Sequence, residues 1–149
     1  MNMLLISGLV AGLLSTAMMT LFEISAWKKW GLFGVYEWHE NQAITTYLLG
    51  DTSGKTHYFG IFFFHFLNGT LAGIAFPYLV SFVLPYVPLL VVSTIHGIIL
   101  WLLTLAPIHK PITGLSPWNH PPGRWPAVTS LVGHIIYGLV LGIIFLILG

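Results

Sequence analysis

The sequence predicts an all-α membrane protein, a bundle of four transmembrane helices built from two parallel-repeat helix hairpins. Three observations lead to this fold class: the composition, four long apolar stretches and an internal repeat. Of the 149 residues, 56% are hydrophobic and only 6% are charged, whereas a soluble domain carries about 25% charged residues. We therefore expect a lipid bilayer around the chain. Helices are predicted because a helix satisfies its backbone polar groups within hydrocarbon.

Each apolar stretch is close to the roughly 20 residues that a helix needs to cross a bilayer core. The four predicted spans are Met3–Ser25, Tyr58–Phe82, Val87–Pro107 and Ala127–Leu148. Together they form a single transmembrane domain over residues 1–149.

The positive charges predict how this domain is oriented. All five cations follow the first and third spans: Lys28, Lys29, Lys55, Lys110 and Arg124. Because positively charged loops stay in the cytoplasm, we expect a multi-pass cell-membrane protein with both termini outside and loops 26–57 and 108–126 cytoplasmic. Cations divided between two loops form no continuous basic patch, so nucleic-acid binding has no support. The chain has no cysteine, which excludes disulfides and iron–sulfur clusters.

A repeated phrase links the second and fourth spans. The sequence His65-Phe-Leu-Asn-Gly-x-x-x-Gly-x-x-Phe recurs as His134-Ile-Ile-Tyr-Gly-x-x-x-Gly-x-x-Phe. The repeat halves are about 1–82 and 83–149, and both enter the membrane from the same side. The repeat is therefore parallel, with its pseudo-two-fold axis along the membrane normal. In a square bundle, spans two and four lie on a diagonal and both histidines can face the axis.

Three pairs of glycines predict close helix packing. Small residues four positions apart let helix backbones approach one another in a membrane, and the pairs are Gly8 and Gly12, Gly69 and Gly73, and Gly138 and Gly142. His65 and His134 each lie four residues before such a pair, so they share its face and point toward protein.

The two long connections differ in character. Residues 27–55 interleave aromatic and charged side chains, as expected at the headgroup level, and Glu37–Leu49 is predicted as a short interfacial helix. Residues 108–126 are rich in proline and are expected to form a stiff, non-helical cap. Pro77 is expected to kink the second span, because it removes a backbone hydrogen bond.

Some of these features together resemble a known family. The first span runs through Gly-x-x-x-Gly into Ser15-Thr-x-Met-Met-Thr20, Leu48-Leu49-Gly50 follows in the first connection, and the last span carries His-x-x-Tyr-Gly-x-x-x-Gly. This combination resembles an uncharacterised family of small four-helix membrane proteins of bacteria and archaea. The resemblance covers most of the chain and implies the same topology, but no activity.

Histidines and carboxylates toward the cytoplasmic side are the candidates for chemistry. Imidazole and carboxylate suit zinc, iron or copper. The spacing matches no known metal signature, so ligands would have to converge from separate segments. The candidate metal ligands are His65, His134, Glu23, His120 and His39.

Two other interpretations of the intramembrane histidines remain open. His65 and His134 could be the axial ligands of a haem b, with the nearby glycines giving space for the macrocycle. Alternatively, each imidazole forms a hydrogen bond across helices, to residues such as Asn68 or Tyr137 or to a backbone carbonyl. His96, at mid-membrane, is either a satisfied buried histidine or a candidate proton relay.

Three function classes follow. The first is an accessory or structural subunit of a membrane complex, with a larger membrane protein or a second copy as its partner. Its expected mark is a stripe of small residues left unpaired, which Gly8, Gly12 and Ser15 could provide. The second is a redox component that binds a metal ion or haem b. The third is a small transporter or channel. Whether the chain is an enzyme stays open.

Overall fold

The computed structural model describes residues 3–81 and 86–148, and within these ranges all regular elements are helices. In chain order they are α1 (Met3–Trp30), the 3₁₀ helix η1 (Gly31–Gly34), α2 (Tyr36–Leu49), α3 (Tyr58–Val80), α4 (Leu89–Leu103), the π-helix η2 (Thr104–Ile108), α5 (His109–Thr113) and α6 (Trp125–Leu148). The predicted end of the second span at Phe82, and most of the turn that follows it, lie outside the described residues.

Three helical stretches of the described chain are long and apolar enough to cross a membrane: Met3–Gly34, Tyr58–Val80 and Trp125–Leu148. The predicted class is confirmed to this extent: the described chain is all-helical and has helices long and apolar enough to cross a membrane. The predicted third span differs. Its regular α-helix, α4, has only 15 residues and continues directly into the π-helix η2. The wider π turn contains Pro107, whose ring and missing N–H do not fit a regular α-helix.

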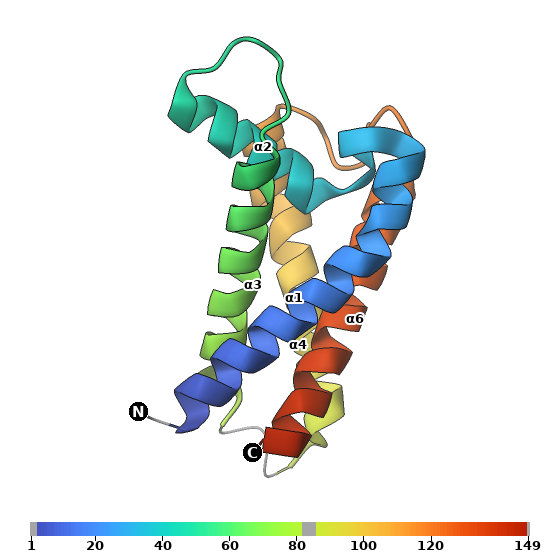
Figure 1. Cartoon of the computed structure of the whole chain (residues 1–149). Coiled ribbons are helices and arrows are strands. Elements are labelled where there is room, and N and C mark those ends of the chain that lie inside the picture. Colours follow the sequence, from blue (N-terminus) through green and yellow to red (C-terminus); the bar gives the residue numbers. More distant parts are fainter. Residues whose placement is uncertain (1–2, 82–85, 149) are drawn as a thin grey trace.

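The long helices pack through their glycines. α1 crosses the molecule obliquely and contacts both α3 and α6, while α4 packs along α6 (Figure 1). A Cβ atom on Gly73 would lie 2.5 Å from the Cα of Gly12, and one on Gly138 would lie 2.4 Å from the carbonyl oxygen of Ser93. At both contacts the backbones are too close for any side chain, which is the geometry that small residues permit.

The two long connections lie at the same end of the molecule, opposite the start of α1 and the end of α6 (Figure 1). α2 covers this end. Its residues Tyr36 and Trp38 are buried, and the side-chain amide of Asn41 donates a hydrogen bond to the carbonyl oxygen of Ile61 on α3 at 3.1 Å. The interfacial helix expected at Glu37–Leu49 is therefore a helix, and its buried residues pack against the rest of the molecule.

The expectation of a non-helical cap over residues 108–126 is wrong for its first part. The chain continues from α4 through η2 into α5, which ends at Gly114 with a positive φ of 75°. Only the stretch after Gly114 is irregular. This continuation matters for the site, because it carries His109 on a helix turned toward α2.

Candidate metal centre

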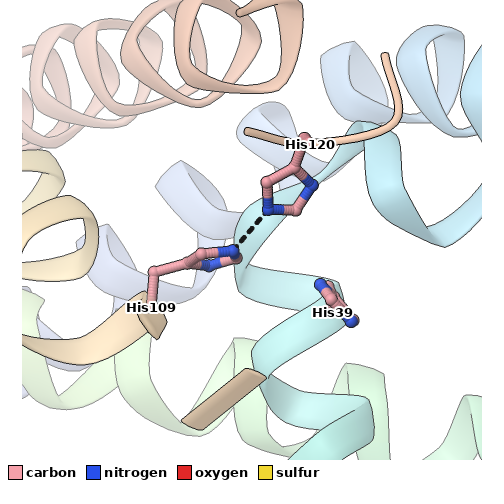
Figure 2. Close-up of side chains that lie close together, drawn as sticks. All are labelled: His39, His109 and His120. Atoms are coloured by element: carbon pink, nitrogen blue, oxygen red, sulfur yellow. Dashed lines mark hydrogen bonds between the residues drawn. The ribbon is translucent and has the colours of Figure 1, made fainter. Parts of the chain in front are cut away.

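Three histidines from three separate segments converge at the end of the molecule that α2 covers. His39 comes from α2, His109 from the first position of α5, and His120 from the irregular stretch before α6. One ligand nitrogen from each ring lies within 4.8 Å of the other two. Figure 2 shows His109 and His120 pointing at each other, with one nitrogen of His39 turned toward this pair. We call these residues the three-histidine cluster.

The closest approach is between His109 and His120. Their Nε2 atoms are 2.6 Å apart, so one of them must donate a proton to the other. An ion between them would replace that proton. A tetrahedral zinc ion with Zn–N bonds of about 2.0–2.1 Å separates its ligand nitrogens by roughly 3.3 Å. A small widening of this contact is therefore sufficient for two of the three rings to share an ion.

Glu40 orients His109 for this role. The Nδ1–H of His109 donates a hydrogen bond to Glu40 Oε1 at 2.8 Å, and this fixes the tautomer whose Nε2 lone pair faces His120. A carboxylate behind a ligand histidine is the usual outer support of a metal site. Tyr36 closes the other side, with its ring 4.3 Å from that of His109 and its hydroxyl donating to the carbonyl oxygen of Pro117.

Burial keeps the cluster uncharged. Burial lowers the pKa of His39 to about 4 and that of His109 to about 3, and it also lowers the pKa of His120. Neutral imidazoles are the form that binds metals. Burial, helped by the nearby charge of Glu37, raises the pKa of Glu40 to about 9. A bound cation would oppose this effect and favour the carboxylate.

A second polar cluster lies deeper between the long helices and is built differently. His65 Nε2 is 3.0 Å from the hydroxyl of Thr20 and 3.5 Å from the buried carboxyl of Glu23. His134 donates from Nδ1 to the carbonyl oxygen of Ser130 at 2.9 Å. The same atom lies 3.4 Å from Glu37, which also accepts a hydrogen bond from Ser130. Each histidine thus has its own partners, and we call this the paired cluster.

The structure therefore divides the predicted metal ligands. His39 and His120 belong to the three-histidine cluster, whereas His65, His134 and Glu23 belong to the paired cluster.

The glycines that were expected to give space for a haem b beside His65 and His134 contact other helices. The hydroxyl of Thr16 would lie 2.0 Å from a Cβ on Gly69, and the hydroxyl of Tyr137 donates to the carbonyl oxygen of Gly69 at 2.6 Å. Gly138 is covered by the backbone of α4. These glycines serve helix packing, and the haem b interpretation of His65 and His134 stays a prediction.

The remaining predicted residues lie apart from both clusters. His96 is buried on α4, with its ring 5.2 Å from that of Phe76 and with its Nε2 unpaired among the described residues. Gly8 and Gly12 pack against α3, and Gly142 packs against Ser93. The proton-relay interpretation of His96 stays a prediction.

Sequence reasoning placed His109 and Glu40 among the histidines and carboxylates of the cytoplasmic side, but not among the five candidate metal ligands. His109 is in the proline-rich segment that was expected to lack a helix. No periodic pattern could therefore predict where its side chain points. Glu40 is adjacent to His39, and adjacent residues on a helix point in different directions. That geometry is the signal available, because Glu40 can reach His109 while His39 faces the other two histidines.

Comparisons with protein-family profiles, with curated proteins and with solved structures found no match to this chain. The function therefore has to be argued from the site itself.

Proposed function

We propose that this chain is a membrane protein that binds one transition-metal ion, zinc or copper, through His39, His109 and His120. The observation that carries the proposal is the convergence of three ring nitrogens within 4.8 Å, with one ring held by a buried carboxyl group. Imidazole suits zinc and copper among the divalent metals. Three protein ligands leave a fourth position for water or substrate, as in catalytic zinc sites. A zinc ion held in this way acts as a Lewis acid and lowers the pKa of its bound water.

We propose that the ion lies at the cytoplasmic end of a four-span domain. Support comes from the five cations, which follow the predicted first and third spans, and from α2 and α5, which lie at the end opposite the start of α1. On this proposal α4 and η2 supply the third span, and α5 follows it at the cytoplasmic end. The parallel repeat is supported by the equivalent packing of α1 on α3 and of α4 on α6, each through glycines.

The small residues of the first span bear on the accessory-subunit hypothesis. Its expected sign is a stripe of small residues left unpaired on the first span, which Gly8, Gly12 and Ser15 could provide. All three are buried within the chain. Gly8 and Gly12 face the backbone of α3. The small residues that were expected to receive a partner are used inside the molecule.

The test is metal stoichiometry. The protein is purified in detergent from the membrane fraction, stripped with a chelator, and reloaded separately with zinc, copper and cobalt. We expect about one ion per chain, a visible cobalt spectrum typical of a tetrahedral site, and loss of both in His120→Ala. The matched control is His57→Ala, since His57 is a loop histidine paired with Asp51 outside the cluster. Equal metal content in the two variants would overturn the proposal.

A further inference from the structure

A cavity of about 320 Å³ lies beside the paired cluster. It is formed where α3 and α4 barely touch, since α1 contacts α3 and α6, and α4 packs mainly on α6. Leu103 and Ile108 are part of its lining, and they are 49% and 39% exposed. The cavity therefore reaches the outer surface of the helices, and on the proposed membrane placement it opens toward lipid. A volume near 300 Å³ is at the lower end of ligand pockets.

Unpaired polar groups line this cavity. His134 is 6% exposed and gives its Nδ1–H to the carbonyl oxygen of Ser130, so its Nε2 is an acceptor that forms no hydrogen bond among the described residues. Glu37 Oε2 is buried without a partner. Across the cavity on α3, Asn68 is exposed at the depth of the long helices and also forms no hydrogen bond among the described residues. Unpaired polar groups facing hydrocarbon are costly, so these three sites indicate a polar occupant.

The lining also restricts the charge of that occupant. Glu37 and Glu40 border the cavity, and no lysine or arginine lines it in the described part of the chain. Phosphate and carboxylate headgroups are recognised by cationic side chains, so an anionic lipid headgroup does not suit this lining. An uncharged molecule with hydroxyl donors suits it, because hydroxyls can donate to the acceptor nitrogen of His134 on one wall while Asn68 is available on the other.

We propose that this cavity binds the ring of a hydroquinone dissolved in the bilayer, with its aliphatic tail leaving between α3 and α4. The two ring hydroxyls lie on opposite sides of a flat ring. One donates to His134 Nε2 on α6, and the other bonds the side-chain amide of Asn68 on α3. The apolar residues of α4 and η2 cover the ring face. The inference rests on the proposed membrane placement and is independent of the metal ion.

Binding can be measured with three probes of equal tail length. The chain is reconstituted in nanodiscs under anaerobic conditions and titrated with decylhydroquinone, decylbenzoquinone and 4-decylphenol, with tryptophan fluorescence as the signal. We expect saturable binding of decylhydroquinone at about one per chain. Decylbenzoquinone has no hydroxyl donor, and decylphenol has only one, so each should bind about tenfold more weakly, because a wall group is left unpaired. Equal or unsaturable uptake of the three probes would overturn the proposal.

Variants locate the site. Asn68→Ala and His134→Leu should each weaken decylhydroquinone binding about tenfold, and Leu103→Trp should block the mouth. The matched control is His96→Leu, which removes a buried histidine that does not line the cavity. Because Asn68 and Leu103 are exposed, their variants keep the fold testable if His134→Leu fails to fold. Unchanged decylhydroquinone binding in both Asn68→Ala and Leu103→Trp would overturn the placement of the binding site in this cavity.

The failure of this inference is separable from failure of the metal centre. His120→Ala should lose metal and keep decylhydroquinone binding, whereas Asn68→Ala should do the reverse. A chain that binds the probe but no metal contradicts only the metal centre.

Discussion

The three-histidine cluster and the paired cluster use the same two residue types and differ in how their nitrogens are used. In the three-histidine cluster, three rings present nitrogens to one point, and the carboxyl group of Glu40 stands behind one ring. In the paired cluster, Glu23 and Glu37 lie directly at His65 and His134, so each histidine faces its own partners. Convergence favours an ion, whereas one-to-one pairing favours helix cohesion. Residue type alone does not distinguish the two.

The largest expected effect separates the clusters by metal affinity. His109→Ala removes a ligand from the three-histidine cluster, and we expect zinc to bind more than about 100-fold more weakly, beyond the range typical of an outer-shell residue. His65→Ala removes a histidine of the paired cluster and should leave zinc affinity unchanged. Competition with a chromogenic chelator measures both. Similar losses in the two variants would contradict the distinction between the clusters.

The sequence predicts the long helices well but does not predict the direction of His109. Composition and the length of the apolar stretches predict the long helices. Each stretch covers about 20 residues, so a single atypical residue does not change the prediction. The direction of His109 depends on the π turn around Pro107, and no periodic pattern reports such a turn. The sequence therefore identifies His39 and His120 as candidate ligands and groups them with His65 and His134, whose neighbours are determined by helix packing at Gly69 and Gly138.

The next effect concerns the carboxyl group behind His109. Glu40→Ala leaves the Nδ1–H of His109 without its acceptor, and we expect zinc affinity to fall about 10- to 100-fold. Glu40→Gln retains a carbonyl oxygen at this place and should lose less. Glu37→Gln is the matched control, because Glu37 is on the same helix but contacts His134 of the paired cluster. An equal loss in Glu37→Gln would show that net charge, and not the contact to His109, governs affinity.

The pH dependence of the metal-free protein should report the three-histidine cluster as well. His39 and His109 have folded pKa values of about 4 and about 3, below the ordinary value of about 6.5. Below pH 6.5 the unfolded chain therefore binds more protons, and stability falls as the pH is lowered. Glu40 has the opposite sign, because its folded pKa of about 9 is raised and the stability it contributes is lost as the pH rises toward 9.

Two histidines outweigh one carboxyl group at acid pH, so the thermal unfolding midpoint of the metal-free protein should have a maximum near pH 6.5. The slope on either side should stay below about 1.4 kcal/mol per pH unit, because solvent reduces these shifts. Glu40→Gln should reduce the decline on the alkaline side and make the acid side steeper, because Glu40 opposes the two histidines there. An unfolding midpoint that does not change between pH 4.5 and pH 9 would contradict the assignment of these groups.

The smallest expected effect measures the cohesion within the paired cluster. Glu23 is fully buried, and one of its carboxyl oxygens lies 3.5 Å from Nε2 of His65. A double-mutant cycle with Glu23→Gln and His65→Gln isolates this pair from the other contacts of each residue. Polar contacts between membrane helices average about 0.6 kcal/mol and reach about 1.7 kcal/mol, so we expect a coupling free energy in that range from reversible unfolding in detergent. Zinc affinity should not change in any of the three variants. A coupling near zero would mean that the two side chains share a place without stabilising each other, and a change in zinc affinity would mean that the paired cluster and the three-histidine cluster are one site.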